Sequence, residues 1–148
     1  MITISGRPLY RLESVLRSWE GTPRMAGQRV KGGGADCAGF VVGVMEEMVG
    51  NKMEHPPLLD AFQVRSTAEK AFREYFDAFP TEILKGEEVE PGDIIIVGRQ
   101  NIGKEHILFV GNGALWHCGH KGVSKTGTAL QGNMRVKKIL RYKDKGDW

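Results

Sequence analysis

Residues 32–50 read GGGADCAGFVVGVMEEMVG, a run of glycines that leads into a helix with a cysteine at its start. Asp36 is a residue type that caps helix N-termini, and Gly50 followed by Asn51 ends the helical pattern. Cys37 is therefore predicted in the first helical turn, where unpaired backbone N–H groups and the helix dipole favour a negative charge. The apolar residues recur at the spacing of one buried helical face: Phe40, Val41, Val44, Met45, Met48 and Val49.

The position of Cys37 has two interpretations. A thiol at a helix start is expected to have a pKa below the free value of about 8.5, especially beside an imidazolium, and the thiolate is the nucleophilic form. The plainer alternative is a small apolar cysteine that covers the start of a helix. The glycine run and the histidines downstream keep the nucleophile hypothesis open.

The composition predicts one domain spanning residues 1–148. The longest apolar runs, such as Ile94–Val97, are too short for a membrane span, and the first 25 residues lack the apolar core of a secretory signal. We expect a protein made in the cytoplasm without a signal peptide and without membrane insertion.

The charges are nearly balanced, with 21 basic and 18 acidic residues and a net charge of +3. No nucleic-acid partner is expected. A local basic cluster is interpreted as a solvated strand edge, with contact to an anionic polymer as the alternative. The cluster comprises Arg135, Lys137, Lys138, Arg141 and Lys143.

The two cysteines, Cys37 and Cys118, permit one disulfide, but an intracellular setting argues against it. The chain has no CxxC pair, and its four histidines lack the spacing of zinc ligands. No metal and no organic cofactor are expected.

Helical patterns occupy the first half of the chain. Residues 8–19 carry an apolar helical face that Glu20–Pro23 ends, and residues 24–36 are predicted to be a loop. His55-Pro56-Pro57 is interpreted as a surface crossing, and the capping box at residues 66–69 predicts a third helix that ends by Pro80. The apolar face of that helix would comprise Ala68, Ala71, Phe72, Tyr75, Phe76 and Phe79.

From residue 91 the pattern becomes extended. Pro91-Gly92-Asp93 predicts a turn, residues 94–97 a strand, and Arg135–Tyr142 a further strand. Residues 106–111 and 114–118 flank Asn112-Gly113, the strongest short hairpin signal. Helices followed by antiparallel strands predict an α+β domain with N-terminal helices packed on an antiparallel sheet.

A two-residue turn at Asn112-Gly113 would pair Leu108 with His117. His106 and His117 would then be diagonal neighbours on one face of the sheet, with Cys118 and His120 on the other. Cysteine chemistry needs an imidazole base and a polar group that orients it. Strand parity leaves open which of His106 and His117 is the base, while His120 is expected to face solvent.

Four motifs follow one another between residues 19 and 117: WEGTP at 19–23, GGGADCAGFV at 32–41, PGDIIIV at 91–97 and EHILFVGNGALWH at 105–117. Together they resemble the motifs of the NlpC/P60 family of papain-like cysteine peptidases. The segments Lys31–Gly39 and Glu46–Gly50 are most similar to the phage-tail and gene-transfer-agent cell-wall peptidases.

The resemblance implies that Cys37 is the nucleophile, His106 the general base and His117 the residue that orients the base. It implies hydrolysis of the D-γ-glutamyl-diamino acid bond in peptidoglycan stem peptides, without a cofactor. It also implies association with phage tail proteins and action on the cell wall. The backbone N–H of Cys37 would help bind the oxyanion, and Asp36 would cap and position the helix.

Two departures from the family pattern concern the substrate. Arg24 stands where the family has a tyrosine, and Ala38 replaces a serine that often touches the stem peptide. Arg24 is either a partner for a substrate carboxylate or a surface loop residue.

Two other functions stay open: a catalytically silent structural tail-tip or assembly protein, and an N-acetylmuramoyl-L-alanine amidase of a related papain-like group.

Overall fold

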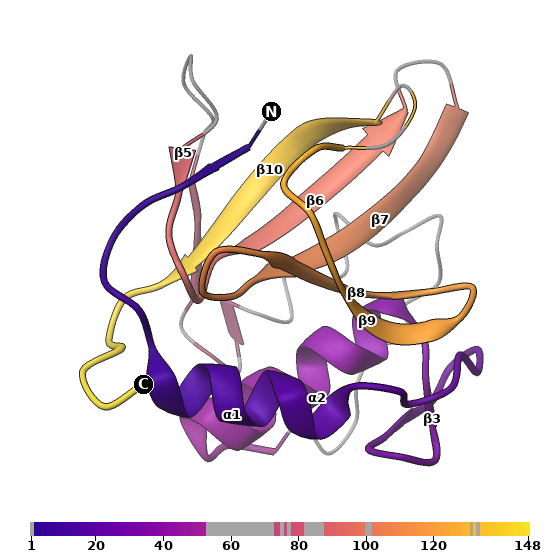
Figure 1. Ribbon diagram of the computed structural model, residues 1–148, viewed down its shortest axis with the longest axis horizontal. Helices are drawn as coiled ribbons and strands as arrows, with labels where there is room; N and C mark the ends of the chain where they lie inside the picture. The colour runs from indigo at the N-terminus through magenta and orange to yellow at the C-terminus, as the bar shows by residue number, and fades with distance from the viewer. Residues whose placement is uncertain are drawn as a thin grey trace.

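The computed structural model describes residues 2–52, 73, 74, 76, 78–81, 88–99, 102–130, 132 and 134–148. Helices α1 (Tyr10–Trp19) and α2 (Cys37–Val49) lie on the same side of an antiparallel sheet of six strands (Figure 1). The predicted α+β class, with N-terminal helices on an antiparallel sheet, is confirmed.

The strand order in the six-stranded sheet is β4-β10-β6-β7-β8-β9. The bounds are β4 Ala78–Thr81, β6 Ile94–Arg99, β7 Ile102–Val110, β8 Leu115–Gly119, β9 Gly122–Thr126 and β10 Met134–Tyr142. Two small pairs lie outside this sheet: β1 (Thr3–Ile4) runs parallel to β5 (Glu88–Val89), and β2 (Arg29–Val30) runs antiparallel to β3 (Gly34–Ala35).

Helix α1 buries the side of its amphipathic pattern that carries Leu12, Leu16 and Trp19. Glu20 caps the C-terminus of α1, and Gly21 follows with a positive φ of 83°. The predicted helix over residues 8–19 is confirmed, with its first turn at Tyr10.

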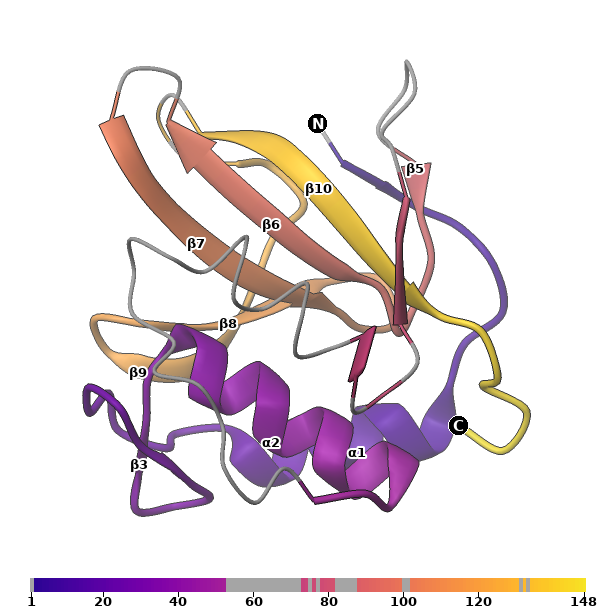
Figure 2. The same cartoon turned by 180° about the vertical axis from the view of Figure 1, so that it is seen from behind.

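Helix α2 begins and ends where the sequence predicts. The Asp36 carboxylate accepts the Gly39 N–H at 2.6 Å, and Gly50 adopts the left-handed conformation while its N–H donates to the Glu46 carbonyl oxygen. Every residue from Cys37 to Met45 is buried, so α2 is covered on more than the single face predicted. Figure 2 shows α2 beneath the sheet, where it packs against β7, β8 and α1.

The hairpin of β7 and β8 has the predicted register. Phe109 pairs with Trp116 and Val110 with Leu115, and the Gly111 N–H donates to the Ala114 carbonyl oxygen at 2.9 Å. These pairs leave Asn112-Gly113 as the two-residue turn, as the sequence predicts.

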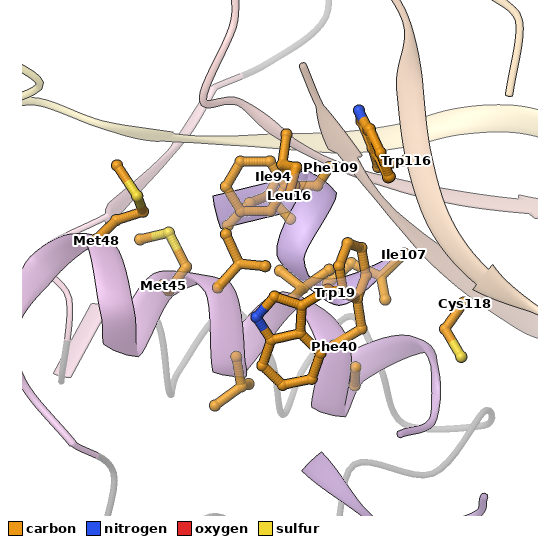
Figure 3. Close-up of a cluster of buried hydrophobic side chains, with 14 of the residues drawn as sticks. Leu16, Trp19, Phe40, Met45, Met48, Ile94, Ile107, Phe109, Trp116 and Cys118 are labelled. Carbon is orange, nitrogen blue, oxygen red and sulfur yellow. The ribbon is translucent and has the colours of Figure 1, made fainter. Parts of the chain in front are cut away.

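Alternate side chains of the strands fill two separate cores. The helix-facing core, shown in Figure 3, takes Ile107, Phe109, Trp116 and Cys118 from the hairpin. The core on the opposite face takes Leu108, Val110 and Leu115 from the hairpin. Cys118 therefore lies on the predicted face.

The third predicted helix is partly wrong. Arg73, Glu74 and Phe76 are helical, but Ala78–Thr81 forms the edge strand β4, which pairs with β10. Phe79, predicted on a helical face, is thus a strand residue. The backbone of β10 offers partners that local apolar spacing cannot reveal, and a proline is tolerated on an edge strand. The capping box at 66–69 and His55-Pro56-Pro57 lie outside the described residues.

Arg141 of the basic cluster, near the end of β10, has a structural partner. Arg141 makes two hydrogen bonds, of 2.9 and 2.8 Å, to the carboxylate of fully buried Asp93. Asp93 also accepts the Glu90 N–H and closes the predicted turn at residues 91–93. Arg141 is therefore not a purely solvated charge, and it fastens β10 to that turn.

None of the helices in the part of the chain that the structure describes has both the length and the apolar character to cross a membrane.

Candidate active site

Cys37 is the first residue of α2, with 4% of its surface exposed. Backbone N–H groups of Ala38, in the same helical turn, and of Ile107, in β7, interact with its sulfur. The thiol thus lies where the N-terminus of α2 meets the sheet.

The absence of a side chain at Gly39 has a steric reason. A Cβ on Gly39 would overlap the carbonyl oxygen of Gln28 and lie 2.9 Å from Asp36 Oδ1. Ala38 is fully buried. The loop before the helix therefore packs directly on its first turn and holds Cys37 in place.

His106 on β7 and His117 on β8 are in direct contact. His106 Nε2 lies 3.0 Å from His117 Nδ1, and the rings meet edge to face at an interplanar angle of 83°. The predicted proximity of these two histidines is confirmed.

The strands that carry the histidines diverge beyond the paired residues near the turn. Beyond those pairs, β7 stays with β6, and β8 stays with β9 (Figure 1). Cys37 belongs to the helix-facing core. Leu108, which shares a strand face with His106, and Leu115, which shares one with His117, belong to the core on the opposite face of the sheet. The divergence explains how a thiol from the helix side opens onto the same space as the two imidazoles.

That space is a cavity of about 530 Å³. Cys37, His106 and His117 all line it, so the structure brings the three predicted catalytic residues to one site. Apolar side chains form much of the rest of the wall: Val97, Leu108, Leu115, Leu130 and Met134.

The expected lowering of the Cys37 pKa is wrong. Burial raises the pKa of Cys37 to about 11, and the Asp36 carboxylate adds to the rise. Arg24 and the N–H groups of Ile107 and Ala38 lower the pKa but do not offset the loss of solvation. The helix start thus interacts with the sulfur as predicted, yet Cys37 is a neutral thiol at pH 7.

The imidazoles are neutral as well. Burial, followed by the charges of His117, Arg24 and His120, lowers the pKa of His106 to about 4. Burial and the Arg24 charge also lower the pKa of His117. The predicted neighbouring imidazolium is therefore absent at pH 7, and the resting site holds a thiol beside two neutral imidazoles.

Asp36 and Ala38 lie behind the site. The Asp36 carboxylate accepts N–H groups of Gly27, at 2.9 Å, and Gly39, which confirms the capping role. Neither residue is part of the cavity lining, and the Ala38 side chain is fully buried.

Arg24 is exposed and lines the cavity. Its Nη1 donates to the Cys118 carbonyl oxygen at 3.1 Å. Arg24 is thus an exposed residue of the loop before α2 that also borders the cavity lined by the thiol and both imidazoles, which is compatible with both interpretations of this residue.

Sequence reasoning missed part of the cavity wall. His120 is exposed as predicted, but it lines the cavity instead of pointing away, because it lies in the turn after β8, where strand alternation no longer applies. Glu105, Thr126 at the end of β9 and the segment that follows, including Leu130, also line the cavity. Chain folding alone brings that segment here, so no local pattern could have revealed it.

No family model matches the chain, and no curated protein matches it. Among the described residues, no group of three or more His, Cys, Asp and Glu side chains is arranged to hold a metal ion. Both cysteines are free and buried. The chemistry that these groups offer is nucleophilic attack by a thiol with an adjacent imidazole as base.

Proposed function

We propose that the protein is a cysteine peptidase that hydrolyses peptidoglycan stem peptides, with Cys37 as nucleophile, His106 as general base and His117 as the residue that orients the base. The observation that carries the proposal is the shared cavity, which Cys37 lines together with the hydrogen-bonded pair His106–His117. Similarity of four motifs to NlpC/P60 peptidases supports a papain-like fold and the D-γ-glutamyl-diamino acid bond as substrate.

The contact between the histidines is compatible with these proposed roles. Because His106 meets His117 through Nε2, its Nδ1 is the nitrogen left to face a reacting group. A base needs that nitrogen unprotonated, so His106 must carry its proton on Nε2 and donate it to His117 Nδ1. His117 then stabilises the imidazolium that forms when His106 accepts a second proton.

The neutral resting site suits a proton transfer that accompanies attack. The Cys37 sulfur bonds to the substrate carbonyl carbon as its proton passes to His106, and the Cys37 N–H donates to the oxyanion. The carbon–nitrogen bond then breaks, and His106 returns the proton to the leaving amine. Water, deprotonated by His106, cleaves the thioester and regenerates the thiol.

The setting in a phage or prophage tail follows from the similarity of residues 31–39 and 46–50 to tail-associated cell-wall peptidases. Tail proteins would be the partners, and the cell wall would be the place of action.

The proposal is tested by incubating the protein with purified muropeptides and analysing the products by mass spectrometry. We expect a new amine at the diamino acid, absent with Cys37→Ala. Cleavage between the lactyl group and L-alanine would instead identify an amidase. No product with either protein would contradict both activities.

One observation favours a second function, a structural tail component without activity. Cys37 is 4% exposed and its pKa is about 11, as expected of a thiol kept only for packing. This alternative predicts that Cys37→Ala leaves particle assembly and infectivity unchanged.

A further inference from the structure

The carboxylate-binding hypothesis for Arg24 gains a structural basis from the way its backbone is held. Arg24 forms an isolated bridge with Ala35, the Ala35 N–H donates to the Pro23 carbonyl oxygen, and the Met25 N–H donates to the Ala35 carbonyl oxygen. Ala35 precedes the N-cap Asp36 by one residue. The position of Arg24 is thus tied to the start of α2 and hence to Cys37.

The side chain of Arg24 is tied to the opposite wall of the site. Its Nη1 bonds to the carbonyl oxygen of Cys118, the residue after His117. The Arg24 side chain therefore reaches from the loop before α2 to β8. Its charge acts on Cys37, His106 and His117, because it lowers the pKa of all three.

The charge of Arg24 has no acidic partner among the described residues. The nearby Asp36 carboxylate accepts hydrogen bonds from the N–H groups of Gly27 and Gly39. Glu105 is the acidic residue among the described residues that line the cavity. It makes no ion pair with Arg24. A guanidinium has five N–H donors in a planar fork, and the bond to Cys118 uses one of them. The remaining donors match the geometry of a carboxylate.

We infer that Arg24 binds a carboxylate of the substrate next to the scissile bond, and so selects acyl residues that carry one. This inference rests on the proposed function, because it names the group recognised at the same site. A glutamate joined through its side chain keeps its α-carboxylate free, and the residue that Cys37 would attack then carries a negative charge near the reacting carbonyl. An ordinary α-linked peptide lacks this charge unless its side chain supplies one.

The experiment compares two stem peptides that differ only in this group: a D-γ-glutamyl peptide with the free α-carboxylate, and its α-amide. Both are titrated by calorimetry into Cys37→Ala protein, which binds without turnover. We expect the acid to bind roughly tenfold to hundredfold more tightly than the amide. In the double variant Cys37→Ala/Arg24→Gln, the preference should fall to about one, chiefly through weaker binding of the acid.

Two controls isolate the charge. The first control is the double variant Cys37→Ala/Arg17→Gln. Arg17 is an arginine of α1 that is paired with Glu13 and does not line the cavity. This variant should keep the preference for the acid over the amide. Arg24→Lys keeps the charge without the planar fork and should retain part of it. Thermal melts of each variant report folding.

Equal binding of acid and amide by Cys37→Ala protein, a preference that survives Arg24→Gln, or no binding of either peptide overturns the inference. Failure of the proposed function is a different result. In that case the acid binds better and the preference requires Arg24, yet wild-type protein cleaves neither peptide.

Discussion

The reactivity of Cys37 depends on two opposing effects at a single atom. The helix start and the Ile107 N–H stabilise a thiolate, whereas burial destabilises it, and burial dominates. The motif around Cys37 predicted the first effect. It could not predict the second, because the burial of the sulfur depends on packing against β7, which is distant in sequence.

The pH dependence of Cys37 alkylation follows from this balance. With a pKa of about 11, the thiolate fraction at pH 7 is on the order of 10⁻⁴, so iodoacetamide should react roughly a hundredfold more slowly than with a free cysteine. The rate should rise about tenfold per pH unit well beyond pH 9. Peptide mass spectrometry of a Cys118→Ala variant assigns the modification to Cys37. An inflection at or below about 8.5 would contradict the dominance of burial.

The role of His117 is tested by variants that differ in their acceptor. His117→Asn keeps an oxygen that can accept from His106 Nε2, whereas His117→Ala removes it. We expect His117→Ala to lower kcat by about tenfold to a thousandfold, with His117→Asn restoring a substantial part of it. Equal losses in the two variants would argue that His117 fills space and does not orient His106.

At the scale of elements, α2 is the most predictable part of the chain. The Asp36 cap and the left-handed Gly50 are local signals, and both termini of the helix follow from them. The glycines within α2 have a non-local reason, because Gly39 admits the Gln28 carbonyl oxygen and Gly43 admits the Trp19 ring of α1. Sequence alone indicates small residues there but not what they contact.

Gly39→Ala tests the fit between the loop and the first turn of α2. The added Cβ would overlap the Gln28 backbone, so the loop must move, and we expect a loss of about 1–3 kcal/mol in the free energy of unfolding. Gly127→Ala is the matched control, because a Cβ there meets nothing within 4 Å. Urea unfolding of the three proteins measures both effects, and equal stabilities would refute the close contact.

At the scale of the whole molecule, the predictable features are those with a local code. Asn112-Gly113 sets the hairpin register, and that register brings His106 beside His117. Strand β4 and the cavity wall near Leu130 escaped prediction because each depends on pairing or packing between distant segments. The sequence therefore predicted the chemical groups of the site but not the shape of the cavity or its effect on their pKa values.

Burial of His106 also affects global stability. Its pKa is about 4 in the folded protein and about 6.5 in an unfolded chain, so the unfolded state binds the proton more tightly. Stability should therefore fall as the pH decreases from about 6.5 to about 4, by about 3 kcal/mol from this residue, with a further loss from His117. Urea unfolding at several pH values measures the slope, which should be shallower in His106→Gln. Identical slopes would show that His106 is not buried as a neutral imidazole.

If Cys37 and His106 act together on a substrate in one cavity, as we propose, a covalent probe should trap Cys37 with the help of His106. The probe is a D-γ-glutamyl stem peptide with an electrophilic vinyl sulfone at the scissile position, and intact-protein and peptide mass spectrometry locate and time the adduct. We expect one adduct, on Cys37, that forms at least about a hundredfold more slowly in His106→Gln. An adduct on Cys118, no adduct, or a rate that does not depend on His106 would contradict it.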